Sequence, residues 1–179
     1  ANASGDNIYN GALDNASGCA SILAIAEAIT KLPTKEQPKR SQVFLFTTAE
    51  EQGLLGADWY AKHPIFPLDK TAADINHDGA NFFGRTEDYG ALGAKRSDDM
   101  WKIIQDVLKE REMTFTSNEV DDKGFFYRSD HFPFAKGGVP ALNVEGGEKY
   151  LDKSIDAKKI ADEYTAKNYH QPSDNFDEK

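Results

Sequence analysis

The sequence is poor in cysteine, in long apolar runs and in basic charge, and each shortage excludes a class of protein. Cys19 is the single cysteine among 179 residues, so the chain can form neither an internal disulfide nor a thiolate metal cluster. Because no run of about 18 apolar residues is present, we expect no membrane-spanning segment. The excess of 30 Asp and Glu over 21 Lys and Arg argues against a nucleic-acid or anionic-membrane surface, since both need clustered basic side chains.

The first residues, ANASGDNIYNG, are polar and rich in turn formers, and they lack the features of a signal peptide. A stretch of functional character, GALDNASG, follows directly. We therefore expect the chain to be the interior of a longer protein. Its length suits one domain with a hydrophobic core.

Apolar periodicity, capping residues and prolines divide the chain into alternating helices and strands. The unbroken apolar centre of residues 40–48 is typical of a strand that is covered on both faces. Helices are expected at 18–31, 53–63, 98–112 and 156–166, and strands at 40–48, 71–77, 114–120 and 138–145. Residues 81–96, rich in glycine, are expected to be irregular. The alternation predicts an α/β fold in which a mainly parallel or mixed sheet lies between helices.

Acidic side chains follow two of the expected strands directly. Glu50 and Glu51 lie in FTTAEEQGLLG, and Asp78 lies in INHDGAN. Ligands of open α/β sheets bind beyond the carboxyl ends of the strands, so these acids are expected at one edge. Two further polar clusters, GALDNASG and NYHQPSD, contain Asp14 and His170. Asp, Glu and His without Cys form the ligand set of a hydrolytic zinc site.

The four clusters, in this order, resemble the M28 family of zinc aminopeptidases, and the resemblance covers nearly the whole chain. It implies a three-layer zinc-exopeptidase fold over a single domain, 1–179, that is truncated at its N-terminus. It also implies that Asp14 bridges two zinc ions, that Glu51 and His170 complete one ligand set, and that Asp78 binds the second ion. Glu50 is then the general base. Export to the periplasm or outside the cell is a further implication.

One departure from the family pattern concerns the metal. M28 enzymes carry an additional ligand in an H-x-D motif upstream of the bridging aspartate, and no histidine precedes Asp14 here. The better-formed zinc site is therefore expected to be that of Asp14, Glu51 and His170, while the second ion keeps only Asp14 and Asp78. We expect one zinc to bind better than two, and activity to be impaired.

The remaining histidines and the segment YRSDHFPFAKGGVPAL allow more than one interpretation. His77 adjoins Asp78 and, by strand alternation, faces the opposite side, so packing is favoured over metal binding. His63 reads as a surface or capping residue. The segment resembles the part of M28 enzymes that lines the substrate pocket. Its candidate pocket residues are Tyr127, Asp130, His131 and Phe134.

Two functional alternatives remain open beside the aminopeptidase. A glutaminyl cyclase-like acyltransferase uses a similar scaffold with one zinc, and related receptor domains keep the fold without a metal site. Taken alone, LDNASG would be a helix-capping turn, Glu50-Glu51 a solvated strand end and His170 a tail residue. Asp174 could accept a hydrogen bond from a ligating histidine, as carboxylates commonly do. The expected partners are peptides with a free N-terminus.

Overall fold

The computed structural model describes residues 5, 7–79, 81, 83–116 and 123–177. Close contacts group the chain into two compact units, one of residues 1–46 and 156–179 and one of residues 47–155. Each unit is described by itself. The prediction of a single domain stays a prediction.

The first unit is helical. Helix α1, Gly18–Thr30, follows a short irregular helix at Ala12–Ser17, and helix α5, Ala157–Lys167, begins where the side chain of Asp156 accepts a hydrogen bond from the backbone of Lys159. Both predicted helices are thus confirmed. By length and composition alone, 12–30 could cross a membrane, although core helices of soluble proteins meet the same criterion. Asp14 and Asn15 interrupt this stretch with non-helical backbone angles.

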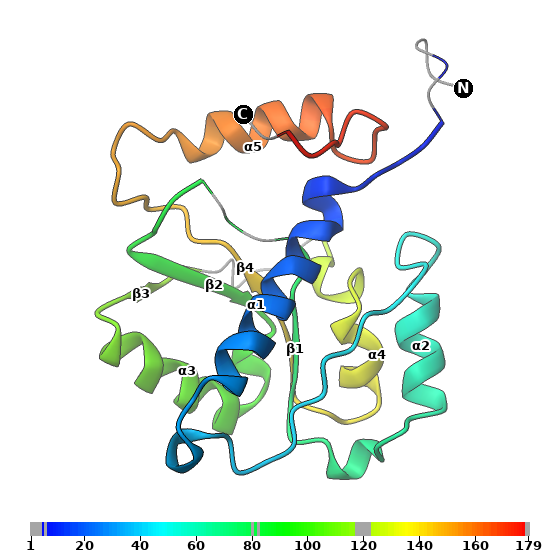
Figure 1. Cartoon of the computed structure of the whole chain (residues 1–179), viewed down its shortest axis with the longest axis vertical. Helices are drawn as coiled ribbons and strands as arrows, with labels where there is room; N and C mark the ends of the chain where they lie inside the picture. Colours follow the sequence, from blue (N-terminus) through cyan, green and yellow to red (C-terminus); the bar gives the residue numbers. More distant parts are fainter. Residues whose placement is uncertain (1–4, 6, 80, 82, 117–122, 178–179) are drawn as a thin grey trace. The chain divides into compact units, whose positions relative to one another are not determined.

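The second unit contains a mixed four-stranded sheet with the order β1-β4-β2-β3 (Figure 1). The strands are β1, Asp74–Asn76, β2, Asp88–Leu92, β3, Thr114–Phe115, and β4, Ala141–Glu145. Strand β4 pairs in parallel with β1 and antiparallel with β2, which in turn pairs in parallel with β3. The sheet is therefore mixed, one of the two forms expected. Of the predicted strand at 114–120, positions 117–120 lie outside the described residues.

Helices pack on the sheet within this unit. Helix α3, Asp98–Glu110, contributes Met100 to a buried cluster with Leu142 of β4. Helix α4, His131–Lys136, contacts β1 and β4, and helix α2, Leu55–Lys62, packs on α4 through Tyr60 and Phe134. Alternate residues of a strand point to opposite faces, and Leu142 faces α3, so its neighbour Ala141 faces away from that helix. The result is the predicted arrangement of helices around an α/β sheet.

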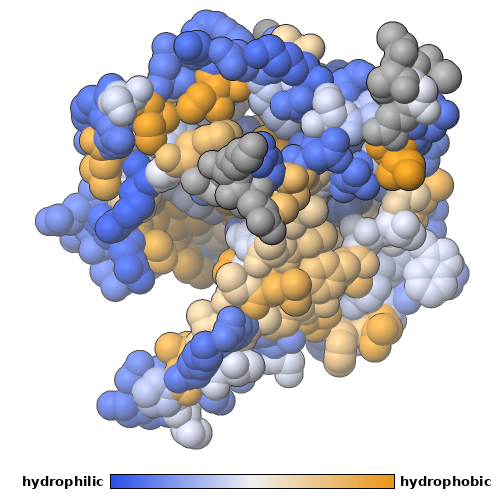
Figure 2. Space-filling view, turned by 45° about the horizontal axis from the view of Figure 1, so that its top comes forward, coloured by the Kyte–Doolittle hydropathy of each residue, from blue (hydrophilic) through white to orange (hydrophobic). Residues whose placement is uncertain are grey.

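The predicted strand at 40–48 is wrong. No strand is found there, and in the part of the chain that the structure describes no strand of the sheet pairs with it. Val43 is 51% exposed and Phe46 is 48% exposed, so the apolar run is not covered on both faces as expected. An apolar sequence favours an extended backbone, but a ladder of interstrand hydrogen bonds is what makes it a strand. Figure 2 shows that apolar side chains gather in exposed patches on one face.

A half-buried acid on β1, Asp74, predicts an unusual dependence of stability on pH. The Oδ2 atom of Asp74 is buried without a hydrogen-bond partner, and burial, together with the charge of Asp130, raises the pKa of Asp74 from 3.8 to about 7. Stability from this group is fully present below pH 3.8 and is lost as the pH rises through 7. Burial lowers the pKa of His131 from 6.5 to about 4. The contribution of His131 to stability therefore depends on pH in the opposite direction. It is present above pH 6.5 and is lost as the pH falls from 6.5.

We therefore expect Asp74→Asn to leave stability unchanged near pH 3.5 and to increase it at pH 8. Since one pKa unit corresponds to about 1.4 kcal/mol, the increase at pH 8 is at most about 4 kcal/mol. Urea unfolding at several pH values measures it, with the exposed Asp106→Asn as the matched control. Equal stability of wild type and Asp74→Asn at pH 8 would show that ionisation of Asp74 does not lower the stability of the protein.

Candidate metal and catalytic site

In the first unit, a carboxylate and an imidazole converge. The Oδ2 atom of Asp14 lies 3.3 Å from Nε2 of His170. Two ligands that each lie about 2.0–2.1 Å from a tetrahedral zinc are separated by roughly this distance. Among hydrogen bonds with a nitrogen donor, the same separation would be long. The pair therefore fits two ligands of one ion.

Neighbouring groups contact both residues of this pair. The buried carboxylate of Asp174 accepts hydrogen bonds from the backbone N–H groups of Leu13 and Asp14. It also accepts a hydrogen bond from the Tyr164 hydroxyl. Burial is the main cause, and this bond the second, of a raised pKa of the Tyr164 phenol. The ring of His170 stacks on Tyr169 at 3.8 Å between centroids. Asp174 thus holds the backbone of Asp14, a different contact from the predicted one with His170.

In the second unit, the two glutamates lie on a tightly closed turn. Ala49, directly before Glu50, and Leu54 both have left-handed backbone angles, φ 56° and φ 59°, which are uncommon for residues other than glycine. The backbone N–H of Gly56 bonds to the carbonyl of Thr48 at 2.9 Å. A Cβ at Gly56 would lie 2.5 Å from that oxygen, so the close approach requires glycine. Such strained turns concentrate at functional sites.

Also in the second unit, hydrogen bonds from the sheet orient Asp78. The Asn76 amide nitrogen donates to Asn143 Oδ1 at 2.9 Å and to the Ser129 hydroxyl at 2.7 Å. The hydroxyl in turn donates to Oδ2 of Asp78 at 2.7 Å. Because Asn76 uses both amide protons, the proton of Ser129 is directed to Asp78. The only sequence signal for Ser129 is its place directly before Asp130, so its role was not predicted.

The four candidate pocket residues lie in different surroundings. Tyr127 lines a cavity of about 410 Å³. Asp130 accepts a hydrogen bond from Thr47, which by itself lowers the pKa of Asp130. Desolvation and the charge of Asp78 outweigh this bond, so the pKa is raised. His131 is fully buried against Phe126, and Phe134 is buried against Tyr60.

The histidines that sequence analysis set apart from the metal are placed as follows. His77 is half-buried, and burial lowers its pKa. His63 is exposed and stacks on Trp59 next to the end of α2. Both positions suit the packing and capping roles expected of them.

Comparison with known proteins places these residues in a family. The model of peptidase family M28 matches residues 2–179. A probable leucine aminopeptidase 2 of Aspergillus oryzae is 28% identical over 91% of this chain and 34% of its own length. A vacuolar membrane protease of Verticillium alfalfae is 43% identical over 42% of this chain and 7% of its own. A solved structure of Porphyromonas gingivalis glutaminyl cyclase covers 82% of this chain and 54% of that one, with 16% identity and a TM-score of 0.49.

These relatives are much longer than the matched chain, which spans 34% of the Aspergillus aminopeptidase and 7% of the Verticillium protease. The names of the relatives also correct one expectation. A periplasmic or extracellular location is wrong as an implication of the resemblance, because several matched relatives, from Verticillium, Yarrowia, Lodderomyces and Saccharomyces, are named vacuolar membrane proteases.

Proposed function

The chain belongs to peptidase family M28, and from this premise we propose that it is a zinc-dependent exopeptidase that removes the N-terminal residue of peptides. The observation that most supports metal dependence is the convergence of Asp14 Oδ2 and His170 Nε2 at 3.3 Å. Relatives named leucine aminopeptidase support the exopeptidase activity.

We assign Asp14, Glu51, Asp78 and His170 as the zinc ligands. The donor set of three carboxylates and one imidazole suits zinc in hydrolytic enzymes. Within the second unit, Ser129 engages Oδ2 of Asp78, which leaves the other carboxylate oxygen for a metal. One better-formed zinc site, rather than two, and impaired activity stay predictions.

In this mechanism, Glu50 handles the proton. Zinc, when bound, supplies polarisation of the scissile carbonyl and a lower pKa of the attacking water. The carboxylate of Glu50 accepts a proton from that water and delivers it to the leaving amine. Glu51 cannot take this role while its carboxylate is a ligand. Glu50 and Glu51 both lie within the closed turn from Ala49 to Leu54, and this short spacing supports a site that uses the two acids together.

The test compares free and blocked N-termini. We expect leucine p-nitroanilide to be hydrolysed and N-acetyl-leucine p-nitroanilide to remain intact, because an aminopeptidase requires the free amine. A chelator should abolish the reaction and added zinc should restore it. Equal cleavage of both substrates, or release of ammonia from N-terminal glutaminyl peptides without hydrolysis, would overturn the assignment.

A further inference from the structure

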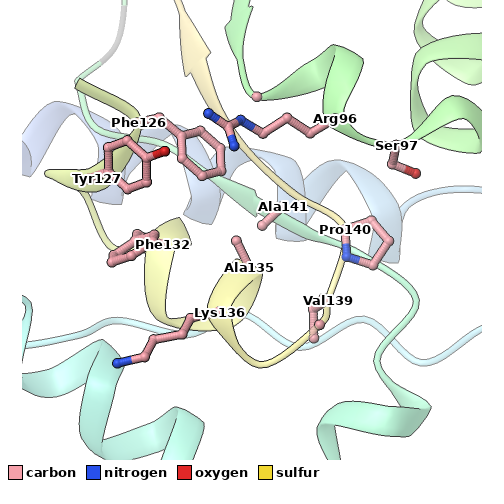
Figure 3. Close-up of a pocket in the computed structure, with 12 residues that line it drawn as sticks. Arg96, Ser97, Phe126, Tyr127, Phe132, Ala135, Lys136, Val139, Pro140 and Ala141 are labelled. Carbon is pink, nitrogen blue, oxygen red and sulfur yellow. The ribbon is translucent and has the colours of Figure 1, made fainter. Parts of the chain in front are cut away.

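A cavity of about 410 Å³ in the second unit is lined by none of the residues assigned above as general base or zinc ligand. Its volume lies within the range of small-molecule pockets. The walls are mostly apolar and aromatic, including Phe126, Phe132 and Val139, and the two charged lining residues, Arg96 and Lys136, are both cationic (Figure 3). Among the residues that the structure describes, no Asp or Glu belongs to the lining.

Arg96 presents its charge over an aromatic surface. Its guanidinium carbon lies 3.8 Å from the centroid of Phe126 and 5.7 Å from that of Tyr127, and Figure 3 shows it directed toward both rings. Phe126 is only 3% exposed, so its ring is a fixed support. Among the described residues, Arg96 forms no ion pair with a carboxylate, in a chain with nine more acidic than basic residues. Its planar group remains able to bind a carboxylate through two parallel hydrogen bonds.

The cavity and Asp78 lie toward opposite ends of the sheet. Ala141, at the amino end of β4, lines the cavity, whereas Asp78 follows the carboxyl end of β1, which runs parallel to β4. Gly93, which also lines the cavity, follows β2, and β2 runs antiparallel to β4. The described lining residues include no acid, which also disfavours a substrate's free N-terminal ammonium group. Within this unit, the cavity therefore differs from the surroundings of Asp78 in both place and charge.

We propose that this cavity binds a small apolar carboxylate, with the carboxylate on Arg96 and the aromatic or aliphatic body between Phe126 and Val139. The ligand is a monoanion. A zwitterionic amino acid is disfavoured, because burying its ammonium group without a partner is costly.

Titration of the full chain with 3-phenylpropanoate, followed by calorimetry, tests the site. We expect saturable binding. 3-Phenylpropan-1-ol should bind at least about tenfold more weakly because it lacks the charge-assisted hydrogen bond, and phenylalanine should bind at least about tenfold more weakly because its ammonium group would be buried without a partner. Arg96→Gln should weaken 3-phenylpropanoate binding by about tenfold. Arg128→Gln is the matched control, because Arg128 lies 5.5 Å from the ring of Phe125 but outside the cavity lining.

Val139→Phe should block the carboxylate and the alcohol together by filling the cavity, provided that its thermal unfolding remains cooperative. Unchanged binding in Arg96→Gln would place the carboxylate elsewhere, for example on zinc, and would overturn the proposal. Absence of saturable binding to the wild-type chain would overturn it as well. Neither result depends on peptidase activity.

Discussion

Glu50→Gln is expected to keep its zinc and to lose turnover by about 10²- to 10⁴-fold, the range that a general base contributes. Glutamine preserves the size of the side chain but cannot accept the proton from water. Since Glu50 is not assigned as a ligand, the zinc content should not change. Steady-state kinetics on leucine p-nitroanilide together with elemental analysis measures both quantities.

Glu36→Gln supplies the matched control, because it makes the same chemical change at a residue on a short helical turn of the first unit. It should retain both zinc and turnover. If Glu50→Gln kept near-normal turnover, Glu50 could not be the base. If it lost zinc, Glu50 would be a ligand and the roles of the two glutamates would be reversed.

Glu51→Gln is expected to lose zinc and activity together. A neutral amide replaces an anionic oxygen ligand, and even partners that only support a ligand typically contribute 10- to 100-fold to metal affinity. We therefore expect zinc binding to weaken by more than about 100-fold. Competition with a chromophoric chelator measures the affinity of the purified variant.

High zinc concentration distinguishes this variant from Glu50→Gln. Excess zinc should partly restore Glu51→Gln by mass action and should leave Glu50→Gln inactive. Zinc affinity of Glu51→Gln equal to that of the wild type would contradict the assignment of Glu51 as a ligand.

Helices were predictable from sequence where local signals agreed. Ser97 caps α3 by accepting a hydrogen bond from the backbone of Met100, as its position before Asp98 indicates. Strand β2 was not predictable, because the sequence DYGAL carries a central glycine that favours irregular structure. A Cβ at Gly90 would lie 2.7 Å from the carbonyl oxygen of Thr116 and 2.9 Å from Cβ of Glu145. Tertiary contact across the sheet, rather than local propensity, therefore selects this glycine.

The candidate site likewise combines residues that the sequence indicated with contacts that it did not. Resemblance of short motifs identified Asp14 and His170, and the structure places them in contact. The bond from Ser129 to Asp78 joins residues 51 positions apart, and the stacking of Arg96 on Phe126 also joins distant segments. Neither contact has a local sequence signature, because each depends on how the loops after β1 and β2 pack.

The division of labour between the adjacent glutamates is tested most directly by measuring zinc content and turnover in the same preparations of wild type, Glu50→Gln and Glu51→Gln. We predict that Glu50→Gln retains the zinc of the wild type with turnover reduced by at least about 100-fold, and that Glu51→Gln lacks zinc. Equal zinc content in all three proteins, or normal turnover in Glu50→Gln, would contradict the account.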